Sequence, residues 1–126
     1  MKKLLLIDDD LVFIKFLTSY IGERFPKLEI LTCSDSIKAL SLINADLDLL
    51  LLDLEMPKLD GSKLLSYAIE KGVDKRRIII LSARDADYLH ERFPMGRCLA
   101  VLNKHEVRQK AVLDMVFDAL QKKPES

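Results

Sequence analysis

Residues 49–61 have the sequence LLLLDLEMPKLDG, in which four leucines lead directly into Asp53. A short apolar run that is ended by turn residues, here Pro57 and Gly61, is typical of a strand buried on both faces of a sheet. Asp53 then stands at the carboxyl end of this strand, where the buried chain reaches solvent. A carboxylate at such a point either caps the next turn or is a reactive group. The other strand ends favour the reactive group.

The rest of the chain alternates between apolar runs and segments with helical spacing. We predict strands over residues 3–7, 27–33, 47–53, 77–82 and 98–102. We predict helices over residues 11–25, 37–43, 60–72, 85–93 and 106–121, of which the second and the fourth are short. Because each parallel crossover needs a helix to return the chain, this alternation predicts a three-layer α/β/α fold with a parallel sheet.

The composition fits one soluble domain. Lysine plus arginine (20) equal aspartate plus glutamate (20), which gives no reason to expect a nucleic acid or an anionic membrane as partner. No apolar stretch approaches the roughly 20 residues of a membrane span. Cys33 and Cys98 lack metal or redox spacing, and we interpret them as small core residues of a cytoplasmic protein. We expect one domain over residues 1–121 and a polar tail over residues 122–126.

Polar side chains follow four of the predicted strands. In an open parallel α/β sheet, ligands bind beyond the carboxyl ends of the strands, where the strand order reverses. The residues at these ends are Asp8 and Asp9, Asp53, Ser82, and Asn103 with Lys104. Three carboxylates, one hydroxyl and one ammonium group would therefore collect at one edge of the sheet.

This set of groups is chemically complete for phosphoryl transfer. Crowded carboxylates either take up protons or recruit a cation, and oxygen ligands without histidine or cysteine select a hard ion such as Mg²⁺. An aspartate can attack phosphorus and form an aspartyl phosphate. Mg²⁺, the Lys104 ammonium and the Ser82 hydroxyl could each contact one phosphoryl oxygen of a phosphorylated Asp53.

Other aspartates at strand-to-helix junctions have a simpler interpretation. We interpret Asp10, Asp35 and Asp60 as helix N-caps, because each precedes a predicted helix. Asp8 and Asp9, taken alone, fit a capping role as well as a metal-binding role. The combination of groups on four strand ends decides in favour of a site.

The chain resembles the receiver domain of two-component response regulators, the family that includes the chemotaxis regulators, over essentially its whole length. The matching motifs are Leu6-Ile7-Asp8-Asp9, Leu51-Leu52-Asp53-Leu54-Glu55-Met56-Pro57 with Asp60-Gly61, Ile80-Leu81-Ser82-Ala83, and Lys104. The resemblance implies a flavodoxin-like (βα)5 fold with five parallel strands in the order 2-1-3-4-5.

The resemblance also implies a metal site and a phosphoacceptor. Asp53 corresponds to the aspartate that accepts a phosphoryl group from a phosphohistidine on a sensor histidine kinase or a histidine phosphotransfer protein. Asp8 and Asp9 correspond to the acidic pair that holds Mg²⁺, with Asp9 the direct ligand. Asp53 and the backbone carbonyl of Glu55 complete the implied ligand set. The cofactor implied is therefore Mg²⁺.

Two further residues correspond to groups that contact the phosphoryl group. Ser82 matches the switch hydroxyl that moves toward it, and Lys104 matches the phosphate-contacting lysine. Glu55 and Arg84, two residues after the acceptor and the switch serine, occupy positions that line the path of the hydrolytic water. They either tune the lifetime of the phosphoryl group or form a surface ion pair. The protein would catalyse its own phosphorylation and slow dephosphorylation without being a metabolic enzyme.

The chain departs from the family pattern at three places. Lys104 is followed by His105, where the family usually has a proline in a cis peptide. Val101 stands where the family has its switch aromatic, so the usual coupling of hydroxyl to aromatic cannot operate as such. Residues 85–96 form an unusual fourth helix region that is interrupted by Pro94.

Two other functions compete with the phosphorylated receiver. Val101 and His105 motivate a pseudo-receiver, a protein-interaction module that works without phosphorylation and binds no ion at millimolar levels. A phosphohydrolase with an aspartate nucleophile would resemble a pattern with aspartate and threonine two and four residues after it. Glu55 and Pro57 occupy those places, which disfavours this enzyme.

Two helices offer candidate partner surfaces. In the first helix, the predicted core face consists of Phe13, Leu17, Tyr20 and Ile21. Leu11 and Val12 point away from this face and Phe16 lies at its margin, which suggests either a kinase-docking patch or helix-end packing. In the final helix, we expect Val107, Ala111, Met115 and Ala119 to face the sheet. That would leave Leu113, Phe117 and Leu120 for a homodimer or for an output domain in a longer protein, or for a wide core contact.

Overall fold

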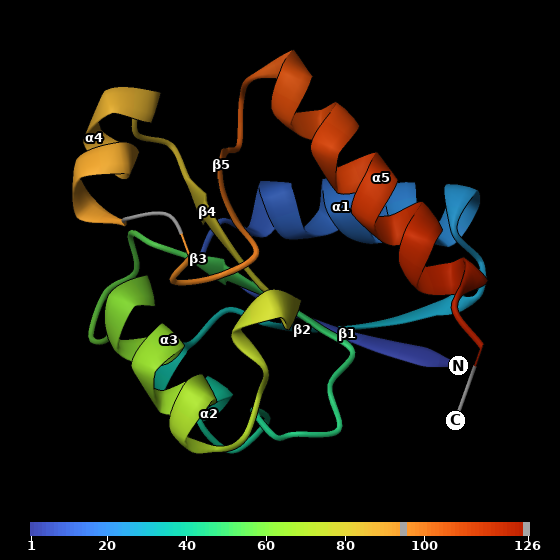
Figure 1. The fold of residues 1–126 in the computed structure, drawn as a ribbon, viewed down its shortest axis with the longest axis horizontal. Helices are drawn as coiled ribbons and strands as arrows, with labels where there is room; N and C mark the ends of the chain where they lie inside the picture. Colours follow the sequence, from blue (N-terminus) through green and yellow to red (C-terminus); the bar gives the residue numbers. More distant parts are fainter. Residues whose placement is uncertain (94–95, 125–126) are drawn as a thin grey trace.

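The computed structural model describes residues 1–93 and 96–124, except for the side chains at positions 86, 90 and 107–109. Five strands alternate with five helices and one short 3-10 turn (Figure 1). The strands are β1 (Lys2–Ile7), β2 (Leu28–Cys33), β3 (Leu49–Asp53), β4 (Ile78–Ser82) and β5 (Ala100–Asn103). The helices are α1 (Leu11–Arg24), α2 (Ser36–Ala39), α3 (Gly61–Glu70), α4 (Ala86–Arg92) and α5 (Val107–Lys122), and the 3-10 turn η1 spans Lys75–Arg77.

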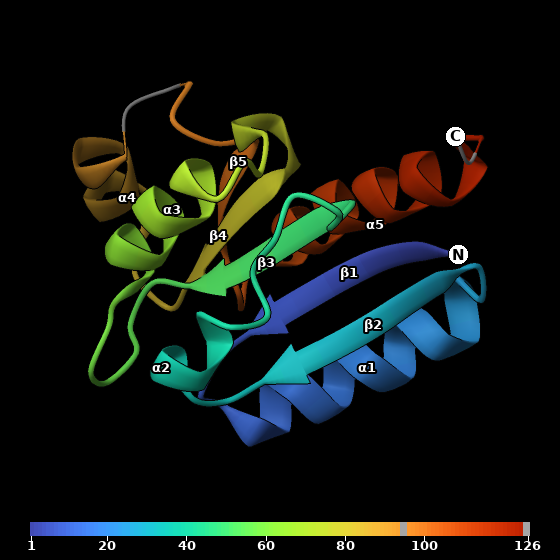
Figure 2. The ribbon, with the colours of Figure 1, turned by 90° about the horizontal axis from the view of Figure 1, so that it is seen from below.

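The five strands form one parallel sheet in the order β2-β1-β3-β4-β5, as predicted (Figure 2). β3 lies at the centre of the sheet, and all five of its residues are buried. Its apolar side chains are removed from water only where strands flank both of its edges and helices cover both faces of the sheet. β1 and β4 flank it and are almost as apolar. The strand order reverses between β1 and β3, which places the ligand-binding edge at their carboxyl ends.

The core divides into two layers, one on each face of the sheet. Alternate residues of β3 serve different layers: Leu49 and Leu51 pack with α1 and α5, whereas Leu50 and Leu52 pack with α2, α3 and α4. This alternation follows from the two-residue period of a strand. Figure 1 shows the resulting division, with α1 and α5 on one side of the sheet and α2 and α3 on the other.

Aspartate side chains start the helices that follow β1, β2 and β3. Asp10 Oδ1 accepts hydrogen bonds from the backbone N–H groups of Val12 and Phe13, and Asp35 and Asp60 cap α2 and α3 in the same way. These three N-cap predictions are confirmed. Because Asp10 supplies the cap of α1, Asp8 and Asp9 are left for other contacts.

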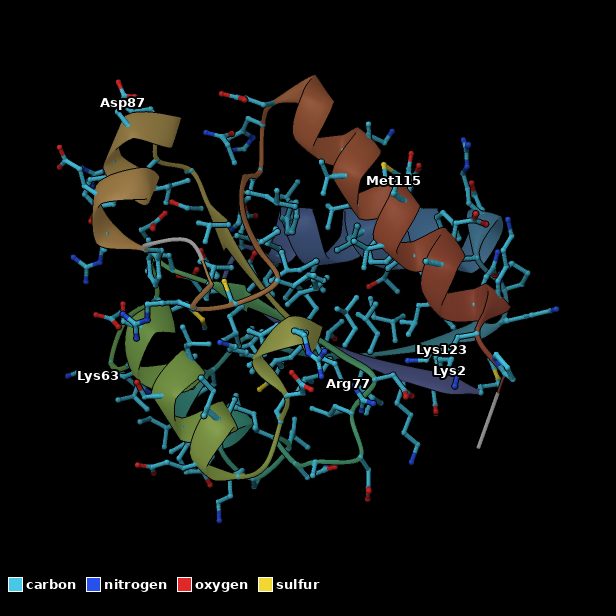
Figure 3. The ribbon with its side chains drawn as sticks, in the orientation of Figure 1. Lys2, Lys63, Arg77, Asp87, Met115 and Lys123 are labelled. Atoms are coloured by element: carbon cyan, nitrogen blue, oxygen red, sulfur yellow. The ribbon has the colours of Figure 1, made fainter. Side chains whose placement is uncertain are left out.

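The prediction for the buried face of α5 is wrong. Phe117 is fully buried and Leu113 is also in the core, while Leu120 packs partly against it. Met115, which we expected to face the sheet, is 72% exposed (Figure 3). The bulky residues at positions 113, 117 and 120 share a stripe, and burying them removes more apolar surface from water than burying alanines does. Leu113 and Phe117 are therefore not available to a dimer or an output domain.

Ala111 and Ala119 are exposed with Met115, and the side chain of Val107 lies outside the described residues.

The face of α1 agrees with the prediction: Leu17 and Ile21 are buried, and Phe13 and Tyr20 pack against the same core layer. The sheet thus holds both α1 and α5 through large side chains. Among the described helices, none is long and apolar enough to cross a membrane.

The fourth helix is short, as predicted. α4 ends at Arg92, and Phe93 follows with an extended backbone and a buried side chain. Leu89 and Phe93 anchor the helix on the α2–α3–α4 side of the core. Pro94, which we expected to interrupt this region, lies outside the described residues.

Candidate functional site

The strand pairing brings the predicted site residues to one edge of the sheet. Ile7 pairs with Leu52, Asp53 pairs with Leu81, and Ser82 pairs with Asn103. Asp8 therefore follows β1 at the level of Asp53, whereas Ser82 and Lys104 lie about one and two residues further along the strand direction. Figure 2 shows the arrowheads of β1, β2 and β3 at this common edge.

Three carboxylates meet there. One oxygen from each of Asp8, Asp9 and Asp53 lies within 4.8 Å of the others. Asp8 and Asp53 are buried, with 0% and 2% of their surface exposed, whereas Asp9 faces solvent. The cluster therefore has a closed side formed by the sheet and an open side formed by Asp9.

Lys104 inserts a positive charge between the two buried carboxylates. Its Nζ lies 2.6 Å from Asp8 Oδ2 and 3.4 Å from Asp53 Oδ1, and its side chain is 6% exposed. The ammonium also lies 4.9 Å from the centre of the Phe13 ring. Burial alone would lower the pKa of Lys104, but the ion pairs with Asp8 and Asp53 outweigh it and raise the pKa above its usual value. Lys104 is therefore a fixed cation.

The environment of Asp53 disfavours its charged form. Burial, followed by the negative charge of Asp8, raises the pKa of Asp53 to about 8, even though the charge of Lys104 opposes this shift. One ammonium thus does not neutralise the site. Without another cation, Asp53 holds a proton over much of the physiological pH range.

The donor set fits a divalent cation with oxygen ligands. Asp8 Oδ1 accepts a hydrogen bond from the N–H group of Asp10, but the buried Oδ2 accepts none from the described residues and has Lys104 as its ionic contact. The cluster consists of carboxylate oxygens alone, as Mg²⁺ prefers. The three crowded carboxylates and the raised pKa of Asp53 indicate that the site has room for more positive charge.

Ser82 binds an unexpected partner. Its Oγ donates to the carboxylate of Glu55, 2.8 Å from both Oε1 and Oε2, and accepts from the N–H group of Arg84 at 2.9 Å. Glu55 Oε1 also accepts from the N–H group of Ala83 at 3.1 Å. Ser82 is fully buried, so this contact decides where its hydroxyl points. Sequence reasoning assigned the backbone carbonyl of Glu55 to the metal site and its side chain to the path of the hydrolytic water or to an ion pair with Arg84. It did not predict this contact with Ser82.

Glu55 also contacts the predicted phosphoacceptor. Its N–H group donates to Asp53 Oδ1 at 3.2 Å, so one residue bridges Asp53 and Ser82. Arg84, which we considered as its ion-pair partner, instead places its guanidinium 4.0 Å from the centre of the Tyr88 ring. The position of Glu55 two residues after the strand-end aspartate was the only sequence signal for this bridge.

The loop between β3 and α3 is held close to the site. Gly61 lies against the backbone of the acceptor strand: a Cβ atom there would be 2.8 Å from the carbonyl oxygen of Asp53 and from the Cα of Leu54. Ser36 anchors the same loop, because its buried Oγ donates to the carbonyl of Pro57 and accepts from the N–H group of Leu59. Both contacts restrain the chain that follows Asp53.

The loop after β5 uses an N–H group that proline lacks. The N–H group of His105 donates to Asn103 Oδ1 at 2.7 Å, and Asn103 Nδ2 donates to the carbonyl of Arg84 at 2.9 Å. The described residues contain no cis peptide bond. Asn103 therefore connects the loop that carries Lys104 with the loop that carries Ser82.

The sequence matches the response regulator receiver domain family over residues 4–119. The receiver domain of a Francisella response regulator is 26% identical, with a TM-score of 0.77, and the match covers 97% of this chain and 98% of that chain. The fold is also that of the response regulator TrrA from Thermotoga maritima, solved in complex with Mg(2+)-BeF (23% identity, TM-score 0.75, covering 95% and 99% of the two chains).

A third similar structure is the receiver domain of a sensor histidine kinase from Pseudomonas aeruginosa, solved with a magnesium ion coordinated in the active site cleft. It is 20% identical, with a TM-score of 0.76, and the match covers 97% of this chain and 98% of that one. The family match spans most of the chain, and the strand order and the clustered strand-end residues agree with it. The chain therefore belongs to the response regulator receiver domain family.

Proposed function

We propose that Asp53 accepts a phosphoryl group from a phosphohistidine and that this modification switches the binding of partners. The observation that carries the proposal is the placement of Lys104, whose ammonium contacts Asp8 and Asp53 inside a buried acidic cluster. A lysine with a purely structural role would not require two crowded carboxylates beside it, because burying charged groups costs free energy. A phosphoryl-transfer site needs both the nucleophile and the cation.

In this reaction a carboxylate oxygen of Asp53 attacks phosphorus while the bond from phosphorus to the imidazole nitrogen breaks. The electron pair of the broken bond stays on the imidazole, and an acyl phosphate forms on Asp53. Asp53 must be deprotonated to attack, so its proton has to leave the site first. Lys104 neutralises charge on the attacking group and on the transferred oxygens.

Asp8, Asp9, Asp53 and the backbone carbonyl of Glu55 are the groups that would hold Mg²⁺. When bound, Mg²⁺ would supply positive charge that stabilises the carboxylates and the phosphoryl oxygens. The clustering of the three carboxylates and the raised pKa of Asp53 support this role. Hydrolysis of the acyl phosphate would return Asp53 to its free form, so the protein acts as a switch.

Mass spectrometry after incubation with acetyl phosphate and Mg²⁺ tests the proposal. We expect the wild-type chain to gain one phosphoryl group on Asp53 and the Asp53→Asn variant to gain none. Asp48→Asn is the matched control, because Asp48 precedes the same strand at its opposite end. A wild-type chain that stays unmodified, or an Asp53→Asn variant that is modified equally, would refute the proposal.

The alternative is a pseudo-receiver that binds partners without phosphorylation. Val101 in place of the family's switch aromatic and the engagement of Ser82 by Glu55 favour it. A Mg²⁺ titration followed by amide chemical shifts separates the two functions. A phosphorylatable receiver shows saturable shifts at Asp8, Asp9 and Asp53 at millimolar Mg²⁺, and a pseudo-receiver shows none.

A patch on α1 is the proposed docking site for the sensor kinase or phosphotransfer protein. Leu11, Val12 and Phe16 are 67%, 80% and 51% exposed, and α1 begins beside the acidic cluster. We expect Val12→Glu to slow phosphotransfer from a purified phosphotransfer protein that acts on the wild type. Labelling by acetyl phosphate should stay unchanged.

The cytoplasm remains the predicted compartment, and the two free cysteines, Cys33 and Cys98, support it.

A further inference from the structure

Ser82 and Ala83 form a small anion-binding pair at the end of β4. The Ser82 hydroxyl and the Ala83 N–H group both donate to Oε1 of Glu55, at 2.8 and 3.1 Å. Two donors that converge on one oxygen form a cradle for an oxyanion. In this structure a carboxylate of the protein itself fills that cradle.

The occupancy of this cradle is exclusive. A serine hydroxyl has one proton to donate, and a backbone amide has one. Ser82 Oγ also accepts from the Arg84 N–H group, so its remaining capacity is directed at Glu55. A second anion can use these donors only after the Glu55 carboxylate has left.

The phosphoryl group on Asp53 is the anion that would compete. The N–H group of Glu55 binds Asp53 Oδ1, so the acceptor oxygen and the cradle are joined through a single residue. Asp53 also pairs across the sheet with Leu81, the residue before Ser82. Phosphoryl oxygens on Asp53 therefore arrive next to the two donors that Glu55 occupies.

We propose that the Glu55 carboxylate is an internal oxyanion that occupies the Ser82–Ala83 cradle in the unphosphorylated protein and is displaced by the phosphoryl group. This inference rests on the proposed phosphorylation of Asp53. Displacement moves a negative charge out of the cradle, and it changes the contact between the loops after β3 and β4. Such a change needs no aromatic residue on β5, where this chain has Val101.

Two competing explanations predict different effects of Glu55 variants on beryllium fluoride binding in saturating Mg²⁺. If the carboxylate blocks the cradle, Glu55→Ala and Glu55→Asp both tighten binding, by about tenfold, because neither side chain reaches the donors as glutamate does. The affinity of Glu55→Gln for beryllium fluoride lies between those of these variants and the wild type, since the neutral amide oxygen still accepts hydrogen bonds from Ser82 and Ala83. If the negative charge alone matters, Glu55→Ala and Glu55→Gln tighten binding equally and Glu55→Asp does not.

The amide resonance of Ala83 gives a second measurement on the unphosphorylated protein. We expect Glu55→Ala to move this resonance and to speed its hydrogen exchange by about tenfold, because the hydrogen bond is lost. Glu70→Ala, which removes an exposed glutamate from the end of α3, is the matched control and should leave it unchanged. An Ala83 amide that is indifferent to Glu55→Ala would overturn the inference.

The outcomes separate this inference from the proposed function. If the affinities of the variants for beryllium fluoride follow the charge at position 55, the Glu55 inference is overturned and the proposed phosphorylation of Asp53 is unaffected. A wild type and variants that all fail to bind beryllium fluoride overturn the proposed function, and the displacement step with it. If Glu55→Ala and Glu55→Asp both bind beryllium fluoride more tightly than the wild type, and Glu55→Ala moves the Ala83 amide resonance, the results support the Glu55 inference and the proposed function.

Discussion

Lys104 and Asp8 form an ion pair that is almost completely removed from water. Their charged atoms are 2.6 Å apart, and their side chains are 6% and 0% exposed. A charge in such a place depends on its partner, because a buried carboxylate without a counter-ion loses its hydration and gains nothing in return. The pair therefore contributes to stability as well as to the chemistry of Asp53.

Replacing Lys104 by methionine should destabilise the cation-free protein by about 3 kcal/mol, because the buried carboxylate of Asp8 then loses its counter-ion. Urea unfolding measures the effect. Lys63→Met is the control, since Lys63 points away from α3 into solvent (Figure 3). Equal stability of the two variants would contradict the prediction.

The raised pKa of Asp53 predicts that the cation-free protein becomes less stable as pH rises. The carboxyl has a pKa of about 8 in the folded protein, against an ordinary pKa of 3.8 for an aspartate in the unfolded chain. Between these values the folded state binds more protons than the unfolded state, so the free energy of unfolding falls from about pH 4 to about pH 8 and is then level. Carboxyls with lowered pKa values, such as Asp74, act in the opposite direction and only at lower pH.

Urea unfolding in a chelator at about pH 5 and about pH 8.5 checks this slope. Asp53→Asn should flatten it, because asparagine does not titrate. Mg²⁺ should stabilise the wild type more at the higher pH, where it does not have to displace the proton of Asp53. A wild-type slope equal to that of Asp53→Asn would show that Asp53 titrates normally.

Gly61→Ala should disturb the acceptor strand. The added Cβ would be 2.8 Å from backbone atoms of Asp53 and Leu54, and backbone cannot move aside as a flexible side chain can. We expect a loss of about 1–3 kcal/mol in unfolding free energy and weaker Mg²⁺ binding. Gly22→Ala is the control: nothing lies within 4 Å of its added Cβ, and alanine should stabilise α1 by about 0.5–1 kcal/mol. Parallel behaviour of the two variants would argue against the contact.

Asn103→Ala should loosen the connection between the loops that carry Ser82 and Lys104. It removes the acceptor for the His105 N–H group and the donor to the Arg84 carbonyl, at a cost of about 1–3 kcal/mol. Asn103→Asp keeps the acceptor alone and should be intermediate. Urea unfolding ranks the three proteins, and faster hydrogen exchange of the His105 amide should accompany the alanine variant only. A stable alanine variant would mean that the loops are held by other contacts.

Much of the fold could be predicted because it depends on local patterns. The leucine run before Asp53 specifies a strand buried on both faces, and Asp10, Asp35 and Asp60 cap helices through N–H groups two or three residues away. The face of α5 could not be predicted as easily. Two apolar stripes compete on that helix, and the shape of the sheet selects the one with Leu113 and Phe117.

The sequence by itself determined the strand order through its family motifs and placed acidic, hydroxyl and ammonium groups at the strand ends. Only the tertiary structure decided that Lys104 pairs with Asp8, that burial and the charge of Asp8 raise the pKa of Asp53, and that Glu55 binds a hydroxyl 27 residues further along the chain. The physical reason is that ion pairing and desolvation depend on distance and burial in space. Neither quantity is contained in the spacing of residues along the chain.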